Sequence, residues 1–314
     1  MKRKTYSNRG LSATWQNLTR RWQLLVLILP ALIWYIVFCY TPMYGVIIAF
    51  KNYSFRKGML GSAWAANHGF EHFIRFFNSY YFWTILRNTV VISLYNLLLG
   101  FPLPIILALC LNEVKNGWFK NMVQTATYAP YFISTVVMCG MLVSFLSPTT
   151  GIVNQLIKKY GGEAIPFLSI PSYFPSIYVI SNVWQSAGWG SIIYLATLSN
   201  VDEQLHEAAI IDGATRFQRM MHISLPYIVP TMVILLILNS GTILSVGYEK
   251  IYLLQNTLNE DTSEVISTYV YKAGLVNAQY SFSTAVGLFN SVTNLIVLVA
   301  VNTIARRTSE NSLW

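Results

Sequence analysis

The sequence predicts an all-α membrane protein with six transmembrane helices. Of its 314 residues, 54% are hydrophobic and 11% are charged, whereas about a quarter of the residues in a soluble domain are charged. Its mean hydropathy is +0.46. Six apolar stretches also reach roughly the 20 residues that a helix needs to cross a bilayer. The lipid bilayer is therefore the expected solvent.

The first 21 residues form a basic, polar segment ahead of the first apolar stretch. They hold six of the 21 Lys and Arg residues, namely Lys2, Arg3, Lys4, Arg9, Arg20 and Arg21. The net charge of +9 could indicate nucleic acid, but this clustering favours contact with anionic lipid and no nucleic-acid partner. The next apolar run is too long for a signal peptide, so we expect it to remain in the mature protein.

The six apolar stretches make a transmembrane domain over residues 22–305, followed by a tail at 306–314. They lie at 22–50, 85–111, 119–146, 176–198, 227–248 and 282–305. An even number of spans places both termini on one side. That side carries twelve Lys and Arg against nine on the other, but without segment 1–21 the numbers are six against nine. The orientation therefore depends on segment 1–21, which favours cytoplasmic termini.

The outer connections, at 51–84, 147–175 and 249–281, are rich in aromatic residues. Aromatic residues near a membrane face usually form an interfacial belt. We therefore expect residues 70–81 to form a short helix that lies on the membrane. The three cysteines lie in or beside apolar stretches without paired spacing, which indicates packing and neither a disulfide nor a zinc site.

Segment 201–226, between the fourth and fifth spans, is the most densely charged inner loop and predicts two short helices. Asp202 or Asn200 can cap the first helix. Gly213 tolerates the positive φ with which a helix can end. Thr215 can cap the second helix.

The second helix is predicted to be amphipathic. Phe217, Met220 and Met221 fall at i, i+3 and i+4 and so share one apolar face. A helix pair of this kind can insert into a groove of a partner protein.

Several landmarks of this segment follow a known spacing. They are Glu207-Ala208-Ala209, three residues, Gly213, nine residues, Ile223, one residue, and Leu225-Pro226. This pattern resembles the EAA loop of permease subunits in binding-protein-dependent ABC importers, and the string 207–214 is similar to the sugar-importing branch. The resemblance implies the type I ABC importer permease fold and the import of an oligosaccharide or related carbohydrate.

In that family the EAA loop forms a coupling helix that docks in a cleft of the ATPase subunit. The resemblance implies that Glu207 meets a basic group in the cleft, that Gly213 supplies the turn, and that Ala208 and Ala209 permit close approach. The other residues of the implied coupling surface are Asp212, Ala214, Ile223, Leu225 and Pro226.

Weaker similarity extends over most of the chain. Residues 182–184, 188–190 and 193–195 resemble the span that precedes the loop in oligosaccharide permeases. Residues 40–45 and 49–51 resemble a sub-branch that serves polysaccharide-degradation products.

The sequence contains no Gly-x-x-x-x-Gly-Lys-Ser/Thr string for binding ATP phosphates. We therefore expect a transport subunit that is not an enzyme and holds no cofactor itself. The resemblance implies two ATPase subunits that bind ATP and Mg, a second, homologous permease in a heterodimer, and an extracytoplasmic solute-binding protein. It places the chain in a bacterial inner membrane.

Polar and aromatic residues of the later spans are candidates for the substrate path. Carbohydrate binding needs aromatic faces and hydrogen-bonding groups at depth, where polar residues usually face the bundle interior. The candidates are Trp184, Gln185, Trp189, Tyr194, Asn239, Asn290 and Asn294. Hydrogen bonding between helices is the alternative explanation for each of them.

Two other functions are weighed against import. A secondary transporter or channel would be expected to carry acidic residues or Arg at depth, and charges are nearly absent from the spans. The string His68-Gly-Phe-Glu71-His72 matches a zinc-protease pattern. Gly69 weakens a helix there, however, and no third ligand is evident.

Overall fold

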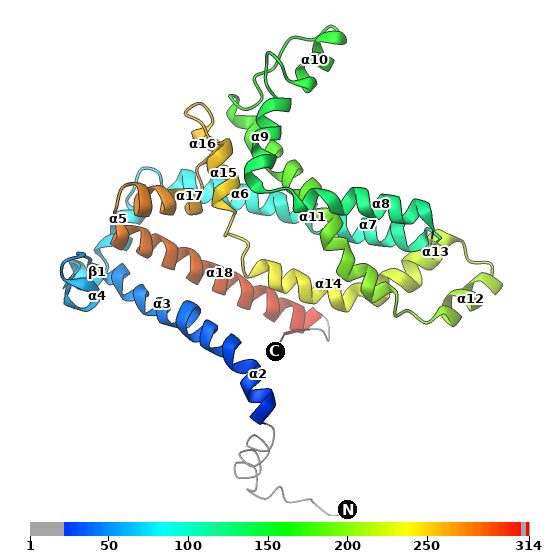
Figure 1. Cartoon of the computed structure of the whole chain (residues 1–314), viewed down its shortest axis with the longest axis horizontal. Helices are drawn as coiled ribbons and strands as arrows, with labels where there is room; N and C mark the ends of the chain where they lie inside the picture. The colour runs from blue at the N-terminus through cyan, green and yellow to red at the C-terminus, as the bar shows by residue number, and fades with distance from the viewer. Residues whose placement is uncertain (1–21, 116, 309–311, 314) are drawn as a thin grey trace, which may run out of the picture.

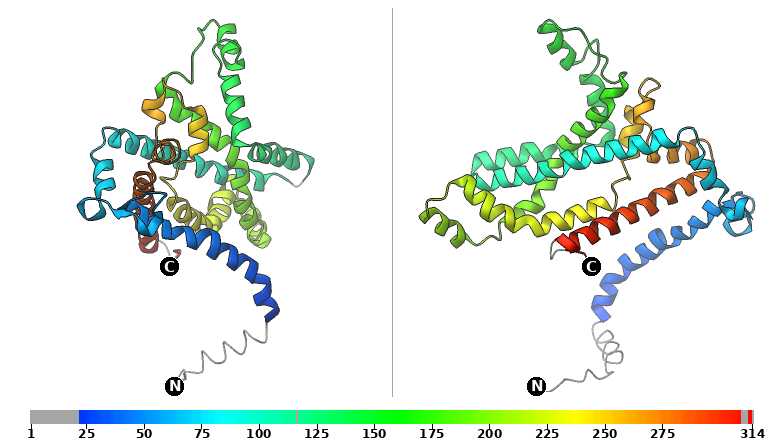
Figure 2. Two further views of the ribbon diagram at one scale, coloured as in Figure 1. Left: turned by 60° about the vertical axis from the view of Figure 1, so that its left-hand side comes forward. Right: turned by 180° about the vertical axis from the view of Figure 1, so that it is seen from behind.

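A computed structural model describes residues 22–115, 117–308 and 312–313, and these are mostly helical (Figure 1). The basic segment 1–21 and part of the predicted tail lie outside the described residues. The body is formed by α6 (Phe82–Gly100), α7 (Pro102–Glu113), α8 (Trp118–Tyr128), α11 (Phe174–Leu198), α14 (Leu225–Ser240) and α18 (Tyr280–Thr308). Helix α11 packs against α6, α7, α8 and α14, and α14 packs against α18. Helix α11 therefore lies at the centre of the body (Figure 2).

Four helices of the described chain are long and apolar enough to cross a membrane, namely Leu25–Phe50, Phe82–Glu113, Arg216–Ser240 and Tyr280–Thr308. A fifth is added if the pair Trp118–Phe132 and Thr135–Phe145, bent by 101°, forms one span. The predicted count of six is thus not confirmed. Helix α11 has 25 residues, but it carries Asn182, Gln185 and Ser186 and is less apolar than the others.

The apolar stretch 119–146 is not the single helix that its composition predicts. Helix α8 continues into the short turn η4 (Ala129–Phe132), in which Pro130 cannot donate a backbone hydrogen bond. Ser134 then starts α9 (Thr135–Phe145), because its hydroxyl accepts a bond from the Val137 amide at 3.4 Å. Helices α9 and α10 (Ile152–Lys159) project from the body (Figure 1), and η5 (Pro171–Tyr173) leads back into α11.

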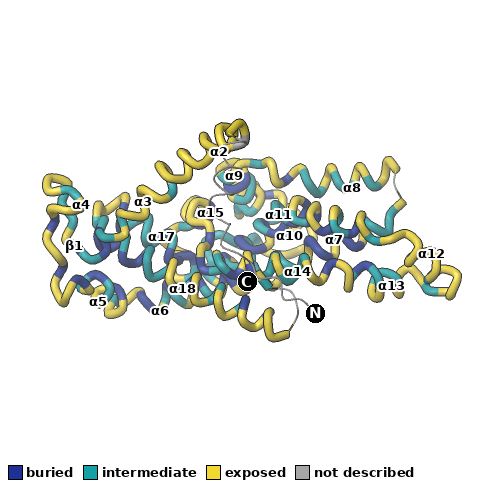
Figure 3. The backbone as a smooth tube through the Cα atoms, turned by 90° about the horizontal axis from the view of Figure 1, so that it is seen from below, coloured by how far each residue is buried: buried dark blue, intermediate teal, exposed yellow. Residues whose placement is uncertain are grey.

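The N-terminal span contacts the body mainly through its last segment, residues 44–50, which packs against α18. It consists of α2 (Trp22–Trp34), η1 (Tyr35–Tyr40), α3 (Thr41–Met43) and η2 (Tyr44–Phe50). None of its most apolar 18-residue window is buried against the rest of the chain, and Figure 3 shows α2 as an exposed arm. This surface is left for lipid or another subunit.

A small aromatic-rich layer closes the end of the body that leads into α6. It comprises β1 (Lys51–Asn52) paired antiparallel with β2 (Ala63–Trp64), together with α4 (Gly58–Gly61), η3 (Asn67–Gly69) and α5 (Glu71–Phe77). The helix expected over 70–81 is thus shorter than predicted. Phe76 is 1% exposed and packs edge-on against Phe82 and Phe289, which joins this layer to α6 and α18.

The fifth span ends earlier than expected. Residues 241–247 are non-helical and lead into α15 (Tyr248–Leu254), α16 (Glu260–Ser263), α17 (Ile266–Tyr271) and η7 (Lys272–Val276). Asn294 of α18 accepts a hydrogen bond from the Leu244 amide at 3.0 Å, and Ser267 donates to the Val246 carbonyl at 2.6 Å. These side chains replace helix hydrogen bonds that the break removes.

Candidate functional site

A cavity of about 560 Å³ lies between α6, α7, α11 and the break at 241–247. Its polar lining consists of Ser93, Asn96, Asn182, Ser186, Asn239, Thr242 and Ser245, and its aromatic lining of Phe101, Tyr131, Tyr178, Trp189 and Tyr194. No charged residue is among the described residues that line it. The cavity therefore offers hydrogen-bonding groups and ring faces without fixed charge at its wall.

Two amides from different helices meet at the cavity wall. The side-chain nitrogen of Asn182 on α11 donates to the side-chain oxygen of Asn96 on α6 at 2.9 Å. Within the described part of the chain, the second polar atom of each amide has no further hydrogen-bond partner. Those atoms remain free for a ligand in the cavity, or for water.

Aromatic rings form another part of the wall. Trp189 stacks on Tyr131, with 4.7 Å between ring centroids and 5° between ring planes. Phe132 meets the same indole edge-on at 5.8 Å. Since Tyr131 follows Pro130 in η4, the bend between α8 and α9 is what brings Tyr131 and Phe132 to α11.

The structure brings three of the predicted path residues to this cavity. Trp189, Tyr194 and Asn239 all line it. Trp184, on the same helix, lies instead in a nearly apolar groove between α9 and α11. Gln185 donates to the Ile133 carbonyl at 2.8 Å and so ties α11 to the bend.

The two predicted asparagines of α18 lie at the break in the fifth span. Asn294 holds both the Leu244 amide and the Ser245 hydroxyl, the latter at 2.9 Å. Asn290 approaches Ser245 at 3.5 Å and lines a second cavity, which shares residues 245–247 with the first. Neither asparagine lines the first cavity, and Asn294 instead bonds to the non-helical residues Leu244 and Ser245.

The sequence-based prediction of the path missed Asn96, Asn182, Tyr131 and Tyr178. Asn182, Ser186 and Trp189 are spaced i, i+4 and i+7 and so share one face of α11. That periodicity was present in the sequence. Asn96 lies 86 residues from Asn182, and no local pattern could have paired them.

The predicted coupling segment 201–226 contains two short helices at one end of the molecule (Figure 1). The Asp202 carboxylate caps α12 (Glu203–Ile211) by accepting from the Gln204 amide at 3.0 Å. Gly213 has φ +81°, a conformation that suits glycine. Thr215 and Gln218 form a capping box at α13 (Arg216–Arg219). The local structure predicted for this segment is therefore present.

The surface of the coupling segment is exposed and partly apolar. Glu207 and Ala208 are exposed on α12, and Ala209 is half-buried. Ile211 is 86% exposed and Phe217 is 66% exposed. Asp212, Gly213, Ala214 and Ile223 surround a small hollow between the two helices. The last two motif residues, Leu225 and Pro226, begin α14, after the π-helical turn η6 (Met220–Ser224).

The His-x-x-Glu-His string has a local structural role. The Glu71 carboxylate accepts from the Ala66 amide at 3.0 Å, and a His72 ring nitrogen lies 3.3 Å from the Lys51 carbonyl. Residues 67–69 form a separate turn in which His68 has φ 57°. The two histidines therefore do not share one helix, as the zinc-protease pattern requires.

A helical membrane protein with a polar, aromatic-lined cavity and an exposed helix pair at one end has the features of a transport subunit. The family described as "Binding-protein-dependent transport system inner membrane component" matches residues 100–310. The chain belongs to this family, which confirms the resemblance drawn from the EAA pattern.

Characterised relatives match over almost the whole chain. Protein LplB of Bacillus subtilis (strain 168) is 42% identical over 307 residues, covering 97% of this chain and 95% of the relative. The polygalacturonan/rhamnogalacturonan transport system permease protein YteP of the same organism is 44% identical over 291 residues, covering 93% and 90%.

A solved structure has the same fold. It is a chain of a bacterial alginate ABC transporter in complex with an alginate pentasaccharide-bound periplasmic protein. The TM-score is 0.86 at 41% identity, and the match covers 95% of this chain and 99% of that chain. This similarity supports the type I ABC importer permease fold for the present chain.

Proposed function

We propose that this chain is a permease subunit of an ATP-driven importer and forms half of the translocation path for an oligosaccharide or related carbohydrate. The observation that supports this most directly is the cavity, in which stacked aromatic rings lie beside uncharged amides and hydroxyls. Sugars present apolar C–H faces that pack on aromatic rings and hydroxyls that bond to amides. The names of the relatives, which refer to polygalacturonan/rhamnogalacturonan and alginate, support a carbohydrate as the cargo.

Six spans are obtained if α11 and the bent α8–α9 pair each cross the membrane beside the four long apolar helices. In this arrangement the exposed N-terminal span and the apolar groove near Trp184 are surfaces for lipid or for a second permease. We infer that a homologous permease completes the path. An extracytoplasmic solute-binding protein is inferred from the periplasmic protein in the alginate transporter complex.

Energy for import is proposed to come from two separate ATPase subunits that bind ATP and Mg. The coupling segment supplies a surface for them, because Ile211 and Phe217 expose apolar area at the end of the molecule that no described residue covers. Glu207 lies beside this area and would pair with a basic group of the ATPase. With cytoplasmic termini, an even number of spans places this segment in the bacterial cytoplasm.

The decisive experiment compares two carboxylates on the same exposed helix. The importer is assembled with its partner permease, ATPases and binding protein, and radiolabelled oligosaccharide uptake is measured. We expect Glu207→Ala to lower uptake and co-purification of the ATPase by about thirtyfold or more, as loss of one partner of a buried interfacial pair does. Glu203→Ala removes the same charge one turn earlier and should leave both within about twofold.

Normal uptake and normal ATPase retention in Glu207→Ala would contradict the coupling role. Equal losses in Glu203→Ala and Glu207→Ala would show that net charge and helix stability, and not the motif position, determine docking.

A further inference from the structure

The side chain of Lys250 is buried just beyond the break in the fifth span. It lies in the first turn of α15, and 5% of the residue is exposed. The following residue, Ile251, belongs to a core cluster that also contains Cys139 and Tyr178. A lysine in these surroundings has lost most of its hydration.

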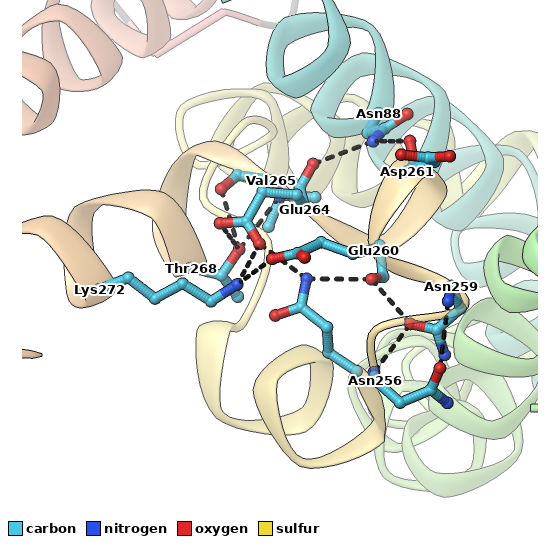
Figure 4. A network of polar contacts seen from close by, with 11 residues as sticks. Asn88, Asn256, Asn259, Glu260, Asp261, Glu264, Val265, Thr268 and Lys272 are labelled. Atoms are coloured by element: carbon cyan, nitrogen blue, oxygen red, sulfur yellow. Dashed lines mark hydrogen bonds and ion pairs between the residues drawn. The ribbon is translucent and has the colours of Figure 1, made fainter. Parts of the chain in front are cut away.

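The ammonium group of Lys250 has no counterion in the part of the chain that the structure describes. Its Nζ has no hydrogen-bond partner among the described residues, and none of their carboxylates lies within ion-pair distance. Lys272, in the same outer segment, instead lies 2.7 Å from Glu260 and 2.6 Å from Glu264 (Figure 4). The chain thus pairs one lysine of this segment twice and leaves the more buried one unpaired, although an unpaired buried charge is costly.

Tyr178 connects this charge with the cavity. Nζ of Lys250 lies 5.6 Å from the centroid of the Tyr178 ring, within the range of a cation–π contact. Tyr178 also lines the cavity, as does Gly247, three residues before Lys250. Because the described lining residues carry no charge and Lys250 is buried, its positive potential reaches the cavity with less screening than in bulk water.

We propose that Lys250 is a specificity-determining residue that favours passage of anionic, carboxylate-bearing oligosaccharides over neutral ones. Lys250 does not line the cavity but lies behind Tyr178. Its ammonium group attracts the carboxylates of the sugar in the cavity, and these supply the negative charge that Lys250 lacks. This inference rests on the proposed function, since it concerns what passes through the same cavity. It adds a charge preference to a site whose own lining is neutral.

The test uses two trisaccharides that differ only at C6 of each sugar, trigalacturonate and its carboxyl-reduced neutral counterpart. Uptake of each is measured in proteoliposomes that contain the complete importer and its binding protein. Each variant is compared with wild type on the same sugar, so that the preference of the binding protein cancels. We expect Lys250→Met to lower trigalacturonate uptake about tenfold, the order expected for loss of one partly screened charge, and neutral uptake by less than about twofold. Lys250→Arg keeps the charge and should retain most of the preference.

Assembly and thermal unfolding of each variant provide a second readout. Removal of an unpaired buried charge should leave the melting temperature unchanged or raised. Equal loss of both sugars, or no loss of either, would overturn the role of Lys250 while leaving the importer function intact. Uptake of the neutral sugar alone by wild type would also overturn it. Uptake of neither sugar by wild type would overturn the proposed function, and this inference with it.

Discussion

The indole of Trp189 lies parallel to the phenol ring of Tyr131, although one residue belongs to the middle of α11 and the other to the turn between α8 and α9. The contact fixes the bend against the central helix and presents the ring pair to the cavity. The same two side chains thus stabilise the fold at the bend and line the cavity of the proposed transport path.

Replacing Trp189 by Ala should lower sugar uptake by the assembled importer. An aromatic platform contributes about 1 kcal/mol or more beyond its buried area, so we expect a loss of about tenfold. Trp184→Ala is the matched control. Both are half-exposed tryptophans of α11, at 44% and 51% exposure, but Trp184 faces the apolar groove. Comparable losses in the two variants would mean that α11 packing, and not the cavity, is affected.

Gly188→Ala should weaken the contact between α11 and α8. A Cβ added at Gly188 would overlap the backbone carbonyl of Thr127, and backbone cannot move aside as a flexible side chain can. Overpacking of this kind costs about 1–3 kcal/mol, which thermal unfolding in detergent would detect. Gly140→Ala, on α9, meets nothing within 4 Å and should be neutral or slightly stabilising. An unchanged melting temperature for Gly188→Ala would contradict the close approach.

Gly213→Val should uncouple uptake from the ATPase, because Val is strained at φ +81°. Gly213→Asn tests the same position with a residue that tolerates this conformation. We expect Asn to retain most ATPase binding and Val to lose at least about tenfold, since strain of about 1–3 kcal/mol would displace the turn. Identical behaviour of the two variants would show that the backbone conformation is not what matters there.

Lys272→Met should destabilise the outer segment by leaving Glu260 and Glu264 without their cationic partner (Figure 4). A lost charged hydrogen bond costs about 1–3 kcal/mol, whereas Lys159→Met, at an exposed position of α10, should stay within about 0.5 kcal/mol.

Burial alone would lower the pKa of Lys272, but the hydrogen bonds and charges of Glu260 and Glu264 outweigh it and raise the pKa. The stabilisation is therefore complete below the unfolded-state pKa and is lost only as pH rises through the folded-state value. Thermal melts at neutral pH should show the full difference between the two variants.

The charge preference of transport should depend on pH. Burial lowers the pKa of Lys250 to about 8, and the other titratable groups near it are Cys139 on α9, Tyr178 on α11 and Glu249 beside it on α15. Uptake of trigalacturonate relative to the neutral sugar should fall as pH rises from about 7 to 9, because the ammonium loses its proton. Lys250→Arg should remove this dependence, since Arg stays charged. A preference that stays constant in wild type would exclude Lys250 as its source.

The same pKa shift determines a dependence of stability on pH. The folded-state pKa of Lys250 lies below the unfolded-state value, so between about pH 8 and 10.5 the unfolded chain binds more protons. The contribution of Lys250 to stability therefore rises with pH across that window. The contribution of Lys272 to stability instead falls as pH rises, because its folded-state pKa is raised. Thermal melts of Lys250→Met and Lys272→Met across this pH range distinguish the two contributions.

Local chemistry was sufficient to predict the two short helices of segment 201–226 from sequence. The cap at Asp202, the turn at Gly213 and the capping box at Thr215 each depend on residues within a few positions of one another. The family itself followed from the same short segment. Where the polar groups of the spans would meet was less predictable, because it depends on contacts between distant helices.

Two features show why the cavity and its surroundings could not be predicted from neighbouring residues in the sequence. The bend at Pro130 is visible as a helix-breaking residue, but its direction depends on contacts with α11, such as Tyr131 on Trp189 and Gln185 with the Ile133 carbonyl. Lys250 looked like one of several charges in an outer connection, and only tertiary packing reveals that it is buried. The hydropathy of α11 did not indicate that it is the central helix. Polar residues of α11 that line the cavity, such as Asn182 and Ser186, also lower its hydropathy.

Ser245, Val246 and Gly247 line both the first cavity and the second one, beside Asn290. This non-helical strip is thus a wall shared by two cavities, of about 560 and 620 Å³. A displacement of the strip would therefore change the volume of both. The hydrogen bonds of the Asn294 side chain with Leu244 and Ser245 restrain such a displacement.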